Sequence, residues 1–510
     1  MSARTLRALL LAGLASVACQ AHRAPSPPAP AAQAEAQRPA VTPEQVEKLL
    51  EPPPPGVTPD APFPTIAESE LPNGLALKVI ERHVHPIIEL RLVVRSGTAT
   101  DGEKPGLAVV SGELLKAGGA GPYSPQKLVE RAEALGTSLD IATDRDATRI
   151  SVNVTSGHLD AALEILSLVA MRPTFLPVEF DKLRTREIER VKSAARGSAG
   201  WAASMVLFRE LFELPTSVHP YSRYDALPED LAKLTLGDSR AWHKEHFVPG
   251  NAALFVAGDV TPAVVQQAAA KWFAAWKGEP PGRPSFSQPF RKNERQVFLV
   301  DRPGSAQSQV FVGLLGAERA SPDWPALAAA NHILGGGVSS RLFLDVREKR
   351  SLAYSTGSSL SDARVGPVPM VLSAGTQTPK TQDTVAALLE NLEAIAQHAP
   401  KQAELDTSRR FLSDSFLFRL ETLGSVADLA AQLYVLELPN DYYDEYRKAI
   451  RSLEVSRVSN TASRYYSATP VIVVAGDAAT LGPSLAAFGP VAVLDPEKGF
   501  ALKRSYPKKP

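Results

Sequence analysis

From about residue 71 onward, some hydrophobic residues have the pattern of strands and others have the spacing of helices. Residues 76–80 follow a turn signal and are predicted as a strand, and residues 87–94 are rich in β-branched residues, which is typical of a second strand. The two are predicted to form a hairpin. Farther along, apolar residues recur every three to four positions, as in helices that pack one face on a core. The predicted helices cover residues 106–116, 125–135, 158–170 and 178–196. Strands and helices alternate without the Gly-rich phosphate loops of nucleotide-binding folds, which indicates an α+β fold.

The same pattern of elements occurs twice. A buried strand ending in Ala-Gly-Asp covers 251–259 and recurs in outline at 469–477. The strand and helix within 90–116 have a counterpart in the strand 309–314 and the helix 323–334. Such repetition predicts two similar α+β halves.

Composition separates these halves from the remaining segments. A stretch rich in Pro, Gly and charge lies between the two copies, and a Pro- and Ala-rich stretch, in which proline prevents helix and sheet pairing, precedes the first. The predicted division is a signal peptide at 1–19, an extended tether at 20–64, a first half at 65–278, a linker at 279–294, a second half at 295–497 and a basic tail at 498–510.

The N-terminal residues resemble a bacterial lipoprotein signal. Arg4 and Arg7 precede the apolar run 9–14, which is too short to cross a bilayer. Small residues then lead to Cys19, which a lipobox would make the lipidated first residue of the mature chain. Gln20 resembles the sorting pattern for the outer membrane, so we expect an anchored protein that faces the periplasm. The alternative is an ordinary secretory signal with an incidental cysteine and a periplasmic product.

Charge and cysteine content narrow the classes of function. The 510 residues include 55 Lys and Arg and 55 Asp and Glu, so no net field recruits nucleic acid. A single cysteine excludes an internal disulfide framework and a cysteine-based zinc site. We therefore expect partners recognised by shape, no nucleic acid, and contact with a membrane only through the lipid.

A long motif in the second half carries a family resemblance. Residues 334–343 read Leu-Gly-Gly-Gly-Val-Ser-Ser-Arg-Leu-Phe, and 346–355 read Val-Arg-Glu-Lys-Arg-Ser-Leu-Ala-Tyr-Ser. With His-Pro-Tyr at 219–221 and Phe-Val-Pro-Gly-Asn at 247–251, they make the chain after the tether resemble the insulinase (pitrilysin) family, which includes the mitochondrial processing peptidase. The resemblance implies a clamshell of two halves around a hollow chamber, each half an antiparallel-rich sheet packed with helices.

Active members of that family carry the zinc motif H-x-x-E-H directly after a Gly-Leu-Ala in the first half. Here the motif segment reads Val-Val-Ser-Gly-Glu, so that Val109 and Glu113 stand at the two histidine positions and Gly112 at that of the general base. The family's distal glutamate would be Glu187 or Glu189. Lone carboxylates do not make a zinc site, so we predict no bound metal and no catalysis by this chain alone.

The remaining histidines suggest no replacement for these ligands. His83 and His85 lie between two predicted strands and are expected at a solvated turn. His243 and His246 have the spacing to share a metal on one helix, but capping or packing is the expected role. His158, His219 and His332 are each isolated in the sequence.

The second half keeps residues with which active members hold the substrate backbone near the metal. Arg347 matches a position suited to orient a carbonyl, and the Tyr354 hydroxyl could stabilise a developing oxyanion. The alternative is a helix salt bridge for Arg347 and packing beneath a strand for Tyr354. Gly335, Gly336 and Gly337 are also predicted to bind substrate, because glycine lets a peptide approach closely, although they could merely turn the chain.

Some bacterial members of the family pair a zinc-bearing chain with one that has lost zinc but keeps this Arg and Tyr. The leading hypothesis is therefore a non-catalytic subunit of a heterodimer, which assists a zinc-bearing homologue in cleaving a peptide or unfolded polypeptide. A structural or binding protein without a proteolytic role is one alternative. An active zinc metallopeptidase with relocated ligands is the other, and it predicts stoichiometric zinc.

Overall fold

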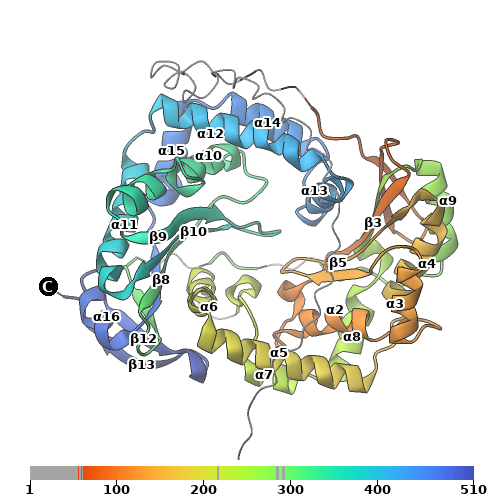
Figure 1. Ribbon diagram of the computed structural model, residues 1–510, viewed down its shortest axis with the longest axis horizontal. Coiled ribbons are helices and arrows are strands. Elements are labelled where there is room, and N and C mark those ends of the chain that lie inside the picture. The colour runs from red at the N-terminus through yellow and green to blue at the C-terminus, as the bar shows by residue number, and fades with distance from the viewer. Residues whose placement is uncertain are drawn as a thin grey trace, which may run out of the picture. The chain divides into compact units, whose positions relative to one another are not determined.

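A computed structural model describes residues 61–509 except 215–217, 283–285 and 290–292, together with Gly56 and Pro59. The chain divides into two compact units, residues 1–59 and 60–510, and every described helix and strand belongs to the second (Figure 1). The predicted signal peptide, Cys19 and nearly all of the tether lie outside the described residues. Among the described helices, none has the length and apolar character needed to span a bilayer.

The first half is built on a six-stranded sheet with the order β1-β2-β6-β3-β5-β4. Its strands are β1 (Ala67–Glu70), β2 (Ala76–Glu81), β3 (Ile87–Val94), β4 (Asp140–Thr143), β5 (Thr148–Thr155) and β6 (Ala252–Gly258). The predicted hairpin between β2 and β3 is wrong, because β6 lies between them, parallel to β2 and antiparallel to β3. All seven residues of β6 are buried, so the most hydrophobic strand takes the central place in the sheet.

Helices cover one face of this sheet and enclose the first hydrophobic core. They are α2 (Leu107–Ala117), α3 (Pro125–Glu133), α4 (Leu159–Met171), α5 (Pro177–Gly197), α7 (Pro228–Lys233), α8 (Leu236–His246) and α9 (Pro262–Phe273), and α6 (Ala199–Leu211) follows α5. The four helices predicted from the apolar period are confirmed to within two residues at each end. Local signals set the boundaries: the Ser124 side chain accepts a hydrogen bond from the α3 backbone, and Pro125 occupies the first turn.

The second half repeats this plan on a seven-stranded sheet with the order β13-β12-β7-β11-β8-β10-β9. Its strands are β7 (Val297–Asp301), β8 (Gln307–Leu315), β9 (Ala353–Leu360), β10 (Pro369–Gln377), β11 (Val471–Gly476), β12 (Val491–Asp495) and β13 (Ala501–Tyr506). As β6 does in the first sheet, β11 lies between a parallel neighbour, β7, and an antiparallel one, β8. The predicted repeat of the buried strand is therefore confirmed.

The second half has its own helical layer and hydrophobic core. The helices are α10 (Trp324–Gly335), α11 (Thr381–Gln397), α12 (Gln402–Asp414), α13 (Leu423–Val435), α14 (Tyr442–Arg451), α15 (Val455–Tyr466) and α16 (Ala478–Leu485), with a π-helical segment, η5 (Phe343–Lys349). The predicted helix at 323–334 is confirmed as α10.

Two predicted boundaries need correction. Residues 498–510 are not a separate tail, because β13 forms an edge of the second sheet and the Phe500 side chain is buried. The tether is predicted to extend through residue 64, but its last residues pack on α14. The Phe63 N–H donates to the Asp444 carboxylate at 3.0 Å, and the Arg447 guanidinium donates to the Ala61 carbonyl at 2.6 Å. The basic residues of 498–510 suggested a solvated tail, and the prolines before residue 64 suggested an extended tether, although both segments contain residues that pack on the second half.

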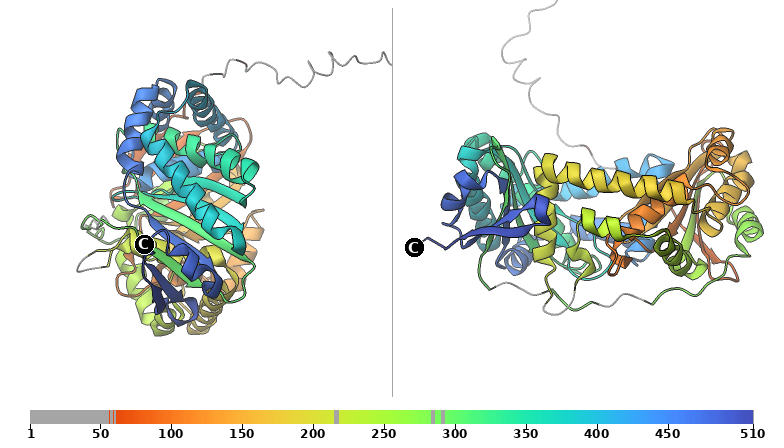
Figure 2. Two further views of the ribbon diagram at one scale, coloured as in Figure 1. Left: turned by 90° about the vertical axis from the view of Figure 1, so that its left-hand side faces the viewer. Right: turned by 90° about the horizontal axis from the view of Figure 1, so that it is seen from below.

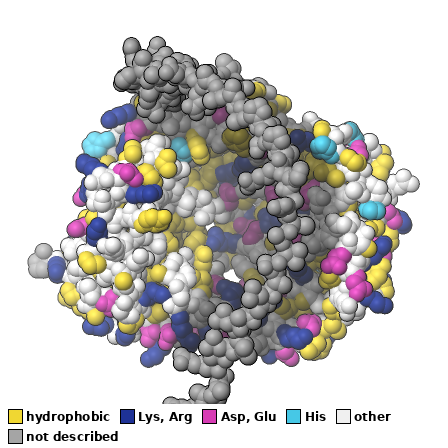
Figure 3. Space-filling model, in the orientation of Figure 1, with side chains coloured by type: hydrophobic (Ala, Val, Ile, Leu, Met, Phe, Trp, Pro, Cys, Tyr) yellow, Lys and Arg dark blue, Asp and Glu magenta, His cyan; other side chains and the backbone are white. Residues whose placement is uncertain are grey.

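The two halves of the second unit exchange helices. From the first half, α6 packs on β8 and β11 of the second sheet, and α13 of the second half packs on β3 and β6 of the first. Two hydrophobic clusters accordingly contain residues of both halves. The right-hand view in Figure 2, from below, shows α5, in yellow, running towards the second half. The face shown in Figure 3 is hollowed between the halves.

Candidate functional site

The segment that matches the zinc motif lies on α2, against strand β4. Gly112, at the position of the general base, is buried, and a Cβ added to it would lie 2.2 Å from Thr143 Oγ1. That hydroxyl hydrogen bonds to the Thr148 hydroxyl at 3.1 Å. Val109 offers no ligand atom. The Thr143 side chain thus occupies the space next to Gly112, and a larger residue at position 112 would have no room unless that side chain moved.

Arginines neutralise the carboxylates that remain at this place. Arg186 Nη2 donates to Glu113 Oε2 at 2.9 Å, and its Nε lies 3.9 Å from Glu187 Oε1. Glu187 is only 7% exposed and also accepts from Arg190 Nε at 2.6 Å. Glu189 lies on the exposed side of α5, where it pairs with Lys192. Of the two candidates for the distal glutamate, Glu187 is therefore the one beside α2.

These residues do not fit a zinc ion. One of the first-half positions carries no ligand atom, and the two carboxylates already bind guanidinium groups. Over the described ranges, no group of three or more His, Cys, Asp and Glu residues could hold a metal. Freedom of the purified protein from zinc stays a prediction for metal analysis.

Three of the histidines contact other groups of the fold, and His83 and His85 are exposed, as expected for a solvated turn. His83 is exposed in the loop after β2, where its Nδ1 contacts the Asp259 carboxylate at 2.8 Å. His243 Nε2 contacts the Ala170 carbonyl at 3.0 Å, and burial lowers the pKa of His243 to about 4. His332 is buried and stacks on Phe411. Packing is therefore confirmed as the role of His243.

The three glycines after α10 differ in what they do. A Cβ on Gly335 would lie 2.3 Å from the backbone N of Ser358, so this glycine allows α10 to approach β9. A Cβ on Gly336 would lie 2.6 Å from His332 Cα, whereas Gly337 is exposed and its nearest neighbour would be 3.9 Å away. Gly336 and Gly337 are both exposed, so these two, unlike the buried Gly335, are open to an approaching peptide.

Arg347 and Tyr354 lie on a stretch of unusual backbone. Arg347 belongs to the π-helical segment η5, and Ser351 has a left-handed φ of 50°. The pairing of β9 with β10 shifts register between Ala353 and Ser355, so Tyr354 lies at a β-bulge of an edge strand. π-Helical turns, bulges and left-handed non-glycine residues concentrate at functional sites, because they re-aim side chains at a cost in stability.

This backbone exposes the pair. Tyr354 is 86% exposed, which makes the predicted alternative of packing beneath a strand wrong. The Arg347 guanidinium carbon lies 5.6 Å from the centre of the Tyr354 ring and 4.7 Å from that of Phe343. Its ion pair with Glu348 is long, at 3.6 Å, and exposed. Both polar ends are therefore available to a ligand, and they are held close together.

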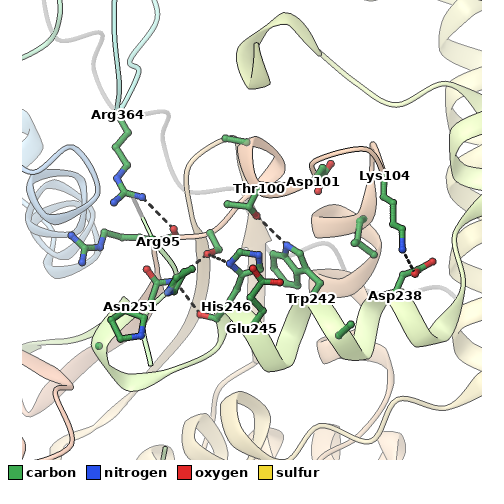
Figure 4. Close-up of a pocket in the computed structure, with 18 residues that line it drawn as sticks. Arg95, Thr100, Asp101, Lys104, Asp238, Trp242, Glu245, His246, Asn251 and Arg364 are labelled. Carbon is green, nitrogen blue, oxygen red and sulfur yellow. Dashed lines mark hydrogen bonds and ion pairs between the residues drawn. The ribbon is translucent and has the colours of Figure 1, made fainter. Parts of the chain in front are cut away.

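Sequence reasoning missed a cavity of about 600 Å³ where the end of β3, α8 and the linker residues 280–282 meet Arg364 of the second half (Figure 4). Arg364 and Arg95 both contact the Glu437 carboxylate, at 2.9 and 3.3 Å. Trp242 forms the floor and donates from Nε1 to Thr100 Oγ1 at 3.0 Å. Because its lining comes from residues more than 260 positions apart, no local pattern could have predicted it.

Several buried polar side chains lie beside this cavity and are paired within the first half. Ser96 Oγ contacts His246 Nδ1 at 3.0 Å, and Asn251 Nδ2 donates to Ser96 Oγ at 3.0 Å, so these groups satisfy one another. The packing role predicted for His246 is thereby confirmed. Asp101 accepts the backbone N–H groups of Gly106 and Ala108, at 2.7 and 2.8 Å, and so fixes the start of α2. Burial raises the pKa of Asp101 to about 7.

Comparison with known proteins matches both halves. The insulinase (peptidase family M16) model matches residues 78–204, and the peptidase M16 inactive domain model matches 233–412. Zinc protease PqqE of Helicobacter pylori is 25% identical over 67% of this chain and 76% of its own. The non-peptidase homolog YmxG of the same species is 22% identical over 74% and 86%. A crystal structure of the peptidase M16 inactive domain from Pseudomonas fluorescens is 23% identical, with a TM-score of 0.75, covering 81% of this chain and 98% of that one. The chain therefore belongs to the insulinase family, peptidase family M16.

Proposed function

We propose that the chain is a non-catalytic subunit that closes a peptide-binding chamber around a zinc-bearing homologue. In the mixed dimer, Arg347 and Tyr354 enter the partner's active site. The guanidinium orients the peptide backbone, and the phenol donates a hydrogen bond to the developing oxyanion. The substrate is a peptide or an unfolded polypeptide.

The contrast between the two halves carries this proposal. In the first half the positions of the zinc motif are filled by Thr143 and by ion pairs that Arg186 makes. In the second half Tyr354 is exposed on a strained bulge, within reach of Arg347. Bulges often re-aim a side chain beside a functional site, so an exposed tyrosine at this bulge fits a role in binding rather than in folding.

The relatives support a division of labour. One organism, Helicobacter pylori, has both a protein named zinc protease and a protein named non-peptidase homolog that are similar to this chain. The pairing of two such chains in this protein's own cell is part of the proposal.

The decisive experiment mixes the purified chain with a zinc-motif homologue from the same cell and follows cleavage of an unfolded polypeptide. We expect no cleavage and no stoichiometric zinc in this chain alone, and cleavage on mixing. Tyr354→Phe removes one hydroxyl from an exposed side chain and should lower kcat by roughly 10- to 1000-fold with little change in KM. Arg347→Ala should lower kcat/KM at least tenfold. Lys349→Ala is the matched control, since it removes an exposed cation from the same segment.

The outcomes separate the alternatives. Unchanged activity in both the Arg347 and Tyr354 variants would contradict the proposed contribution to the partner's site. If the chain cleaves nothing by itself and does not change the cleavage rate of any homologue, the result would favour a structural or binding protein. Stoichiometric zinc with chelator-sensitive cleavage by the isolated chain would establish a metallopeptidase with relocated ligands.

We further propose that the chain is anchored through Cys19 to the outer membrane and faces the periplasm. The support is the lipobox-like sequence and Gln20, which lie outside the described residues. Cys19→Ala should move the protein from the membrane fraction to the soluble fraction. If the natural chain and Cys19→Ala are found in the soluble fraction in equal amounts, the result would favour the secreted alternative.

A further inference from the structure

The cavity between the halves has an excess of positive charge at one end. Arg95 and Arg364 both line it, and the Glu437 carboxylate that they share supplies one negative charge for two guanidinium groups. Arg95 packs over the Tyr434 ring, with its guanidinium carbon 4.5 Å from the ring centre, so its position is fixed from behind. Planar donor forks bind carboxylates well, because a carboxylate accepts two parallel hydrogen bonds. This end of the cavity therefore favours the carboxylate of a ligand.

The same cavity is lined by one carboxylate that has no partner in the fold. Asp238 is paired with Lys104, and Asp101 accepts two backbone N–H groups. Glu245 is exposed, and its side chain forms no hydrogen bond or ion pair with another residue that the structure describes. The negative charge of Glu245 is therefore available to a cation of a ligand.

His246 and Asn251 line the cavity as well, and in the view of Figure 4 His246 lies between Arg364 and Glu245. Asn251 gives its two amide N–H groups to Ser96 Oγ and to the His246 carbonyl, each at 3.0 Å, which leaves its Oδ1 as an acceptor. Because Ser96 Oγ accepts from Asn251, its own proton goes to His246 Nδ1, at 3.0 Å. Burial lowers the pKa of His246, so the neutral ring carries its proton on Nε2, as a donor. One donor beside one acceptor matches the C=O and N–H of a peptide group.

The size of the cavity limits the ligand. Its volume of about 600 Å³ lies within the range of small-molecule sites, roughly 300–1,000 Å³, and Trp242 and Leu107 add apolar surface for side chains. We propose that this cavity binds a short free peptide as a zwitterion, with the C-terminal carboxylate at Arg95 and Arg364 and the N-terminal ammonium at Glu245. None of the lining residues belongs to η5 or β9, so this inference does not depend on the proposed subunit role.

The test titrates the full chain with trialanine, N-acetyl-trialanine and trialanine amide in a calorimeter. Each blocked peptide lacks one of the two terminal charges and is otherwise closely similar to trialanine. Trialanine should bind with a Kd of about 1 mM or below. Each blocked peptide should bind at least tenfold more weakly, because a hydrogen bond to a charged group contributes about that factor or more.

Variants show which residue meets which end of the peptide. Glu245→Gln should weaken trialanine at least tenfold and leave N-acetyl-trialanine unchanged, since that peptide has no ammonium group. Arg364→Gln should weaken trialanine by a similar factor and leave trialanine amide unchanged. Lys244→Gln is the matched control, because Lys244 is exposed in the same turn of α8 but does not line the cavity, and it should bind all three peptides as the natural chain does.

Glu245→Gln decides the question if Arg364→Gln does not fold. The Glu245 side chain has no contact partner to lose, so this variant should unfold at the same temperature as the natural chain. Three results would each overturn the proposal: no heat of binding at about 10 mM trialanine, equal affinity of the natural chain for trialanine and for either blocked peptide, or natural affinity for trialanine in a folded Glu245 or Arg364 variant. Tight binding of N-acetyl-trialanine would show that the cavity takes the C-terminus of a longer chain instead.

Discussion

Gly335, the last residue of α10, is expected to be indispensable for stability, although it belongs to a run of three glycines. A Cβ at this position would lie 2.3 Å from the Ser358 backbone nitrogen and 2.6 Å from Ser358 Cβ, where ordinary contacts are 3.4 Å or more. Gly335→Ala must therefore push α10 and β9 apart by about 1 Å, which is the movement that overpacked cores require.

The magnitude follows from what that movement breaks. Overpacking costs about 1–3 kcal/mol, and the hydrogen bonds between Asn331 and Ser358, each worth about 1 kcal/mol, would lengthen. Replacing glycine by alanine in a helix returns up to about 1 kcal/mol. We expect a net loss of about 2–3 kcal/mol in the free energy of unfolding.

Urea denaturation followed by fluorescence measures this loss, with Gly337→Ala as the control. A Cβ on Gly337 would meet nothing closer than His332 Nε2 at 3.9 Å, so the free energy of unfolding of Gly337→Ala should match that of the natural chain within about 0.5 kcal/mol. If Gly335→Ala were as stable as Gly337→Ala, the close approach of α10 to β9 would not be the reason for the glycine.

Three further predictions test the first half and its contact with the second. Gly112→Ala should destabilise the chain by about 1–2 kcal/mol through its clash with Thr143 Oγ1, and Thr143→Ala in the same chain should recover most of that loss in urea denaturation. Burial raises the pKa of Asp101 to about 7. Between pH 4 and 7 this carboxyl therefore binds more protons in the folded chain than in the unfolded chain, and its contribution to the free energy of unfolding falls as the pH rises through that range. Asp101→Asn should flatten that slope in denaturation midpoints taken from pH 4 to 7; an unchanged slope would assign it to other groups. Phe500→Ala should cost about 3–5 kcal/mol, because its buried ring packs near Trp201 at 6.0 Å between centres; a loss below about 1 kcal/mol in calorimetry would contradict that packing.

Features of the fold that depend on near neighbours in the chain were predictable. The apolar period predicted four helices of the first half, because helix hydrogen bonds join residues four apart. Strand pairing is not local, and the apolar run of β6, which enters between β2 and β3 from more than 150 residues away, could not be assigned a neighbour from its own sequence.

At the candidate site, residue types were predictable and their surroundings were not. The absence of both zinc-motif histidines could be read directly from the residues at 109 and 113. The pairing of Glu113 with Arg186 could not, because it depends on how α2 and α5 pack. Similarly, the sequence does not distinguish Gly335 from Gly337, because only the packing of α10 on β9 makes Gly335 necessary.

The exchange of α6 and α13 means that the internal repeat is not an independent folding unit. Either half produced alone would expose the sheet face that the other half's helix covers, an apolar surface of the kind that leads to aggregation. A chain cleaved in the linker would behave differently, since the two fragments would remain associated through both exchanged helices. Co-expression of the two halves as separate polypeptides should therefore yield a soluble complex where neither is soluble alone.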